Sequence, residues 1–217
     1  MTPRALDLFC GGGGASMGLH RAGFDVVGVD INHQPRYPFC FIQADALTFP
    51  LEGFDFIWAS PPCQAFTAYR RRPGHVAVRP NLIPAIRAWL LEAGVPWCIE
   101  NVTGAPLINA MTLCGSMFGL DVRRHRKFET SWLMLAPPCN HAAQRPRFAQ
   151  ATNRANLRQT VEVGVWRIPL KVQQRAMGID WLPPKELSQA IPPAYAEAIG
   201  RDALHGLIIL DRVRGGA

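Results

Sequence analysis

The sequence predicts an α/β fold with a mostly parallel sheet, because short apolar runs alternate with segments of helical periodicity. Apolar runs typical of strands covered on both faces occupy residues 5–9, 25–29, 39–43, 54–58 and 96–99. Helical spacing occurs at residues 15–22, 82–92, 170–177 and 194–204, and Pro192 and Pro193 suit the start of the last helix.

The periodicity weakens after about Pro137, which predicts a division of the chain into three segments. Residues 1–136 form the α/β core in this interpretation. Residues 137–167 are rich in Arg, Gln, Asn and Pro, so we expect a small loop-rich insert there. Residues 168–217 form a C-terminal segment in which helical patterns resume.

Composition bounds the class of protein. The 217 residues are 48% hydrophobic and 18% charged, which excludes a long disordered chain. The sequence holds no apolar run long enough to span a membrane, and Asp7 interrupts any secretory signal, so we expect a soluble cytoplasmic protein. The net charge of +7 favours a polyanionic partner, nucleic acid first. A coding sequence rich in G and C would produce the same arginine bias, so composition alone does not decide this point.

The cysteines indicate a reducing compartment and no metal site. They are scattered through apolar segments without a CxxC pair, at positions Cys10, Cys40, Cys63, Cys98, Cys114 and Cys139. The nearest metal signal is Cys139-Asn140-His141, and a single CxH is weak, so we predict that the chain binds no metal. A structural zinc ion at this CxH is the alternative.

A glycine loop at residues 11–14 joins the first predicted strand to the first helix, as in nucleotide-binding turns. Asp30 ends the second strand, where an acid can accept hydrogen bonds from both ribose hydroxyls. Asp45 follows the third strand and could reach an adenine amino group. The spacing fits neither GxGxxG nor GxxxxGK[ST], which disfavours NAD and ATP. A merely flexible turn is the alternative.

Cys63 lies in Ser60-Pro61-Pro62-Cys63-Gln64, directly after the strand predicted at residues 54–58. It therefore lies at a carboxyl end of the sheet, where α/β proteins bind ligands. Two prolines fix the backbone before the thiol, and cysteine is a strong nucleophile. A half-buried structural cysteine is the alternative.

Two further segments place polar groups near Cys63. Glu100 and Asn101 follow the strand at residues 96–99, again at a carboxyl end. Arg124 and Arg126 precede an apolar run, and they share one face if that segment is extended. A solvated basic face is the alternative for the arginines.

Together these segments resemble the DNA cytosine-5 methyltransferase family. Residues 7–14 (DLFCGGGG) resemble its DLFxGxGG motif, residues 62–64 its PCQ motif, and residues 100–102 its ENV motif. Arg124 and Arg126 match the RxR of QxRxR, and residues 172–182 and 191–200 resemble the last two motifs. The motifs follow the family's order along nearly the whole chain. The resemblance implies a Rossmann-like S-adenosylmethionine-dependent methyltransferase fold whose C-terminal segment returns to the cofactor pocket.

The resemblance also implies a mechanism. Cys63 attacks carbon 6 of a cytosine flipped out of double-stranded DNA, Glu100 holds or protonates ring nitrogen 3, and Arg126 with Arg124 orients the base. Carbon 5 then takes the methyl group of S-adenosylmethionine. Asn101 completes the catalytic set. The implied cofactor-binding positions are Phe9, Cys10, Gly11, Gly13, Asp30, Ile31, Asp45, Ala46, Pro61 and Gln189.

Three departures from the family pattern affect these expectations. Val122 replaces the glutamine of QxRxR, and Gln189 replaces an asparagine near the cofactor. The segment between Arg126 and Val172 is much shorter than the family's recognition domain, so the enzyme reads a very short site or relies on a partner protein. The arginines of this insert suit phosphate contact, and they are Arg145, Arg147, Arg154 and Arg158. A solvated loop is the alternative.

Three other functions stay open at this point. The same scaffold serves RNA cytosine-5 methyltransferases, although residues 64–67 (QAFT) resemble the DNA branch more closely. A related enzyme could transfer a group other than methyl. An inactive DNA-binding relative is disfavoured by the intact Cys63 and Glu100. We expect a monomeric enzyme of a prokaryotic or viral host cell, of the kind found in restriction-modification.

Overall fold

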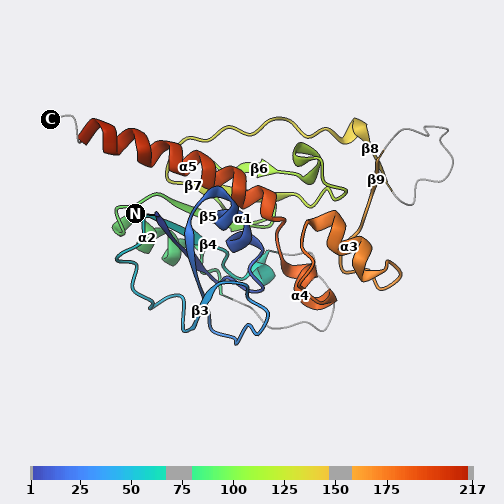
Figure 1. Ribbon diagram of the computed structural model, residues 1–217, viewed down its shortest axis with the longest axis horizontal. Helices are drawn as coiled ribbons and strands as arrows, with labels where there is room; N and C mark the ends of the chain where they lie inside the picture. The colour runs from blue at the N-terminus through green and yellow to red at the C-terminus, as the bar shows by residue number, and fades with distance from the viewer. Residues whose placement is uncertain (1, 67–79, 147–157, 215–217) are drawn as a thin grey trace.

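The structure is a computed structural model that describes residues 2–66, 80–146 and 158–214 (Figure 1). Arg147 and Arg154, two of the arginines expected to contact phosphate, lie outside the described residues, as do the side chains of Arg145 and Arg158. None of the helices in the described ranges combines the length and the hydropathy that a membrane span requires.

Within these residues, seven strands form one sheet in the order β3-β2-β1-β4-β5-β7-β6. The strands are β1 (Arg4–Leu8), β2 (Asp25–Asp30), β3 (Cys40–Gln43), β4 (Phe56–Ala59), β5 (Trp97–Asn101), β6 (Met111–Leu113) and β7 (Arg126–Thr130). Strands β1 to β5 pair in parallel, whereas β7 is antiparallel to both β5 and β6. The predicted α/β fold with a mostly parallel sheet is confirmed.

The strand order reverses between β1 and β4, because the chain runs outward from β1 to β3 and then returns to the other side of β1. In such a sheet the crevice at the carboxyl ends of these strands is the usual ligand site. All of β4 and β5 is buried, as is β1 after Arg4, which explains the continuous apolar runs that predicted them.

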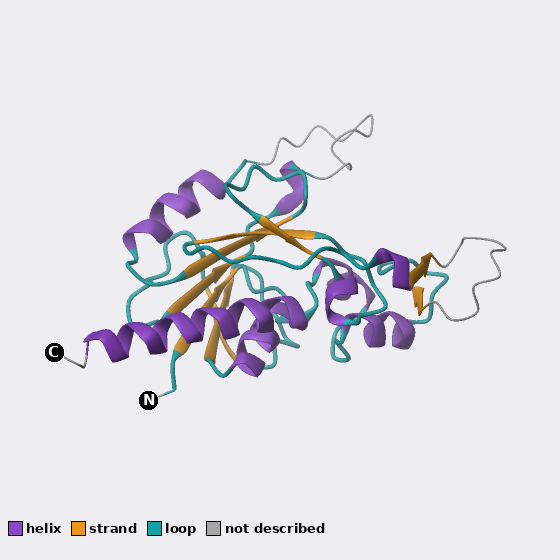
Figure 2. Cartoon of the chain, turned by 90° about the horizontal axis from the view of Figure 1, so that it is seen from above, coloured by secondary structure: helices purple, strands orange, loops and turns teal. Residues whose placement is uncertain are grey.

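Helices cover both faces of the sheet (Figure 2). On one face, α1 (Gly14–Ala22) and α5 (Pro193–Arg214) enclose a core with Phe56, Trp58 and Phe128. On the other, Ile86 and Leu90 of α2 (Ile83–Glu92) pack against Leu6, Leu8 and other strand residues. A Cβ at Gly18 would lie 2.1 Å from the carbonyl oxygen of Pro193, so the close approach of α1 and α5 requires glycine there.

The remaining elements lie beyond the sheet, toward the end of the molecule away from both termini (Figure 1). Here β8 (Gln144–Pro146) and β9 (Arg158–Thr160) form a two-stranded parallel pair. Next to them, α3 (Leu170–Met177) and α4 (Pro184–Gln189) contribute Met177 and Leu187 to a third apolar cluster. The sequence patterns did not predict β6, β8, β9 or α4, which are three to six residues long.

Candidate active site

The glycine loop between β1 and α1 has a left-handed backbone at Phe9, Gly11 and Gly13, with φ values of 60°, 48° and 80°. A Cβ built at Gly11 would meet nothing within 4 Å, so this residue borders open space where a ligand can approach the backbone. The C-terminal segment closes the other side of the loop. Trp181 Nε1 donates a hydrogen bond to the carbonyl of Gly12 at 2.8 Å, and Leu182 packs against the same glycine.

Asp30 ends β2 beside this loop. Its carboxylate accepts hydrogen bonds from the backbone N–H of Gly11 at 3.1 Å and from that of Asn32 at 2.9 Å. The next side chain, Ile31, is apolar and 64% exposed. A fixed carboxylate beside an exposed aliphatic surface fits a nucleoside, whose ribose hydroxyls need acceptors and whose flat base needs an apolar contact.

The other predicted cofactor residues differ in exposure. Asp45 is exposed and accepts a hydrogen bond from Leu47 N–H, whereas Ala46 and Pro61 are buried. Gln189 is exposed at the end of α4. Cys10 is buried, and burial raises the pKa of its thiol far above the ordinary range, so Cys10 offers backbone contacts and no nucleophile.

Cys63 begins the short 3-10 helix η1 (Cys63–Ala65) and is half-buried. The preceding turn is tied to β5, because Asn101 Nδ2 donates a hydrogen bond to the carbonyl oxygen of Pro61 at 2.9 Å. Burial and the negative charge of Glu100 raise the pKa of the Cys63 thiol, and Arg126 and Arg124 oppose this shift. The two arginines are therefore the side chains whose charges favour the thiolate, together with a backbone hydrogen bond to Cys63.

Glu100 is a buried carboxyl group on β5, and Arg126 Nε lies 3.2 Å from its Oε1. Burial raises the pKa of Glu100, against the lowering effects of Arg126, the hydroxyl of Ser60 and Arg124. Ser60 is itself oriented by Trp58, whose Nε1 donates to its Oγ at 2.8 Å. A carboxyl group with a raised pKa keeps its proton to higher pH, as a general acid requires.

Arg124 and Arg126 both act on Glu100, but the condition expected to bring them together, an extended segment, is not met. Arg124 has a φ of 33°, and β7 begins only at Arg126, so the pair does not alternate along an extended strand. Instead, Tyr195 donates its hydroxyl toward the carbonyl oxygens of Arg123 and Arg124, at 3.2 and 3.0 Å. Burial lowers the pKa of Arg124 to about 9, with a further contribution from Arg126.

The structure explains one departure from the family pattern. Val122, at the glutamine position of QxRxR, is 1% exposed and packs in the apolar cluster with Met177 and Leu182. A glutamine here would need hydrogen-bond partners that this cluster does not offer, because burial of an unpaired amide is costly.

Sequence reasoning missed two kinds of residue. Ser60 and Tyr195 support the site through hydrogen bonds that only the fold creates. Four possible metal ligands also come together: Cys114, His125, Cys139 and His141. The CxH pair at residues 139–141 was noted, but the sequence did not connect it with Cys114 and His125.

The sheet order is that of a Rossmann-like methyltransferase fold, with Cys63, Glu100 and Arg126 at the carboxyl edge of the sheet. Residues 4–106 match the family model for C-5 cytosine-specific DNA methylase. A search of curated proteins finds no match.

Solved structures confirm the fold over nearly the whole chain. A candidate DNA modification methyltransferase encoded within an E. coli prophage has 16% identity and a TM-score of 0.61, covering 95% of this chain and 99% of that one. A variant of Spodoptera frugiperda DNMT2 has 12% identity and a TM-score of 0.62, covering 94% and 100%. The Dnmt2 methyltransferase of S. pombe has 14% identity and a TM-score of 0.60, covering 94% and 99%.

Proposed function

We propose that this protein transfers a methyl group from S-adenosylmethionine to carbon 5 of cytosine in DNA, with Cys63 as the nucleophile. The observation that carries the proposal is the convergence of a half-buried thiol, a buried carboxyl group and two arginines at one edge of the sheet. The family match over residues 4–106 supports the reaction class. The net charge of +7 supports a nucleic acid substrate.

Cys63 starts the reaction by attacking carbon 6 of the base. The sulfur–carbon bond forms as the carbon 5–carbon 6 double bond opens, and the electron pair moves into the ring toward nitrogen 3. Glu100 donates its proton to nitrogen 3, so the negative charge does not accumulate on the base. Arg126 holds the Glu100 carboxylate that results and stabilises the thiolate before the attack.

When bound, S-adenosylmethionine supplies an electrophilic methyl group on a sulfonium centre. Asp30 would hold its ribose, Ile31 would contact its adenine, and the backbone beside Gly11 would admit the rest of the molecule. After carbon 5 is methylated, water removes its proton, and the electron pair re-forms the carbon 5–carbon 6 double bond as the thiolate of Cys63 leaves carbon 6. Nitrogen 3 then returns its proton to Glu100, which restores the enzyme.

A stacked base does not expose carbon 6 to a thiol, so the proposal requires a flipped-out or single-stranded cytosine. We assign residues 137–167 as the recognition insert and residues 168–217 as the segment that completes the cofactor pocket. The insert is small, so the enzyme would read a short site or use a protein partner. Sequencing the modified cytosines of cells that express the protein would identify that site.

Two assays test the proposal. The purified protein is incubated with labelled S-adenosylmethionine and either duplex DNA or RNA, and we expect label in DNA at carbon 5 of cytosine. Label in RNA alone would identify an RNA enzyme instead. Absence of label from both substrates would contradict the reaction and favour an inactive nucleic-acid-binding relative.

The second assay uses DNA containing 5-fluorocytosine, whose carbon 5 has no proton to lose after methylation. We expect a covalent protein–DNA complex with the wild-type enzyme and with Cys40→Ser, which alters an exposed thiol on β3. The complex should be absent with Cys63→Ser. A complex that persists in Cys63→Ser would remove this residue from the proposed role.

A further inference from the structure

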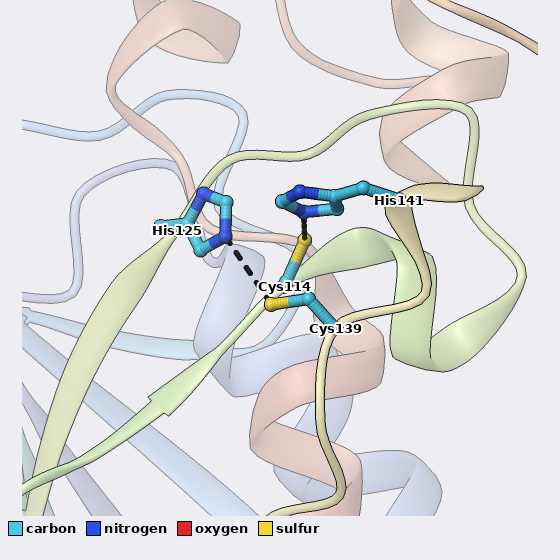
Figure 3. Close-up of side chains that lie close together, drawn as sticks. All are labelled: Cys114, His125, Cys139 and His141. Carbon is cyan, nitrogen blue, oxygen red and sulfur yellow. Dashed lines mark hydrogen bonds between the residues drawn. The ribbon is translucent and has the colours of Figure 1, made fainter. Parts of the chain in front are cut away.

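Four metal-ligand side chains converge at one point beside the start of β7 (Figure 3). We call them the Cys2His2 cluster, and they are Cys114, His125, Cys139 and His141. They come from three segments: Cys114 follows β6, His125 precedes β7, and the other two flank Asn140 at the start of the 3-10 helix η4 (His141–Ala143). Neither β6 nor β7 can bring the residue 139–141 segment into place by sheet pairing alone.

The geometry of the cluster suits a tetrahedral ion. Cys114 Sγ lies 3.2 Å from His141 Nε2, and His125 Nε2 lies 3.3 Å from Cys139 Sγ. The ligand atoms all lie within 4.8 Å of one another. Four ligand atoms no more than 4.8 Å apart fit in a sphere of about 2.9 Å radius. Zinc bonds are about 2.0–2.3 Å long, so an atom at the surface of that sphere needs to move by less than about 1 Å toward an ion at its centre.

The surroundings support the ligands as a metal site does. Cys114 is fully buried, and Ser116 Oγ donates a hydrogen bond to its sulfur at 3.2 Å. The backbone N–H of Asn140 donates to the same hydroxyl at 3.1 Å, which joins the two cysteine-bearing segments a second time. Such hydrogen bonds to ligand atoms orient them and commonly accompany bound metals.

We propose that the Cys2His2 cluster binds one structural zinc ion. Two sulfur and two nitrogen donors within 4.8 Å of one another favour Zn²⁺ over the hard cations Mg²⁺ and Ca²⁺, which require oxygen ligands. Four protein ligands leave no position for water or substrate, so the ion holds structure and performs no chemistry.

The position of His125 gives this ion a role in the proposed methyltransferase site. His125 lies between Arg124 and Arg126, which act on Glu100 and Cys63. The segment with Cys139 and His141 leads directly into β8, the first strand of residues 137–167. One ion would therefore fix the arginine segment and the base of the insert together. This consequence rests on the proposed function, whereas metal binding itself does not.

The test uses the full-length protein purified under reducing conditions without chelator. We expect about one zinc ion per chain by elemental mass spectrometry. Replacement of zinc by Co²⁺ should give the intense visible bands of a tetrahedral site together with a sulfur-to-cobalt charge-transfer band. Cys139→Ser and His141→Ala should each weaken zinc binding by at least about tenfold, and Ser116→Ala should weaken it less.

Two control variants and metal binding by the wild-type protein test the proposal even if a ligand variant folds poorly. Cys40→Ser and His205→Ala change an exposed thiol and an exposed imidazole elsewhere and should retain the ion. Reduced wild-type protein that fails to bind both zinc and cobalt would overturn the proposal. Zinc that survives in the Cys139→Ser, His141→Ala double variant would overturn it as well, as would a Cys114–Cys139 disulfide in the protein isolated from cells. Zinc content is measured without substrate, so these outcomes are independent of methyl transfer.

Discussion

The side-chain amide of Asn101 donates a hydrogen bond to the main-chain carbonyl of Pro61, at 2.9 Å between nitrogen and oxygen. Its Oδ1 accepts the backbone N–H of Val102 at the same distance. Asn101 was predicted as part of the catalytic set. In the structure its side chain connects the end of β5 to the turn that carries Cys63, so we infer that it positions the nucleophile.

Asn101→Ala should therefore reduce kcat by about 10- to 100-fold with little change in KM, because a small displacement of a nucleophile is costly. Loss of this buried hydrogen bond should also destabilise the fold by about 1–3 kcal/mol. Steady-state kinetics and the rate of complex formation on 5-fluorocytosine DNA measure the first effect. An unchanged complex-formation rate in a folded Asn101→Ala protein would contradict the positioning role.

Glu100 and Cys63 together predict the pH profile of kcat/KM. Both pKa values are raised by burial, and the active form carries a protonated Glu100 and an ionised Cys63. The rate should rise with pH up to the pKa of Glu100, stay level, and fall above the pKa of Cys63. Glu100→Gln keeps a donor but loses the titration, so its lower rate should continue to rise until Cys63 ionises. If the pH profile of kcat/KM in Glu100→Gln keeps the same level region as the wild type, Glu100 is not the group that titrates at its lower end.

Arg126 should control the reactivity of Cys63 even without substrate. Its charge lowers the pKa of Cys63, whereas the charge of Glu100 raises it. Arg126→Gln should slow alkylation of Cys63 by roughly 3- to 10-fold near pH 8, and Glu100→Gln should accelerate it. Mass spectrometry of the Cys63 peptide separates this thiol from the exposed Cys40 and Cys139. Arg21→Gln, an exposed change on α1, is the matched control.

Asp30 should determine cofactor affinity. Asp30→Ala removes the acceptor at the end of β2 and should weaken binding of S-adenosylmethionine by about 10- to 100-fold, because hydrogen bonds to charged groups contribute about 1.5–3 kcal/mol. Asp25→Asn, at the exposed opposite end of the same strand, should bind the cofactor normally. Calorimetric titration compares the two variants. Equal affinities would place the ribose elsewhere.

Asp7 should make stability depend on pH. It is fully buried, its Oδ2 accepts the hydroxyl of Ser16, and burial raises its pKa to about 7. The folded state thus holds a proton that the unfolded state releases near pH 4, so stability falls as pH rises through this window and levels off above pH 7. The loss could reach about 4 kcal/mol, and Asp7→Asn should remove it. Urea unfolding at pH 5 and pH 8 measures the free energy of unfolding of the wild-type protein and of Asp7→Asn. The same change between the two pH values in both proteins would contradict the prediction.

The sequence predicted the parts of the site that depend on local pattern. Apolar runs located strands β1 to β5, and the ends of two of them located a polar group: Asp30 at the end of β2 and Glu100 near the end of β5. The left-handed backbone of Arg124 was not predictable from local pattern, and the carbonyl of this residue is bonded by the hydroxyl of Tyr195, far along the chain. The Cys2His2 cluster was not predicted either, since residues 114, 125 and 139–141 share no local motif.

The hydrogen bond from Tyr195 to the carbonyl of Arg124 can form only late in synthesis of the chain. Ribosomes make the chain from its N-terminus, so the glycine loop and Cys63 emerge long before α5 does. A nascent chain that has not passed Tyr195 lacks the hydroxyl that shapes the arginine segment, and it lacks the helix that packs on α1. Fragments left by interrupted translation would therefore carry the Cys63 thiol without the arginine arrangement that the proposed reaction requires.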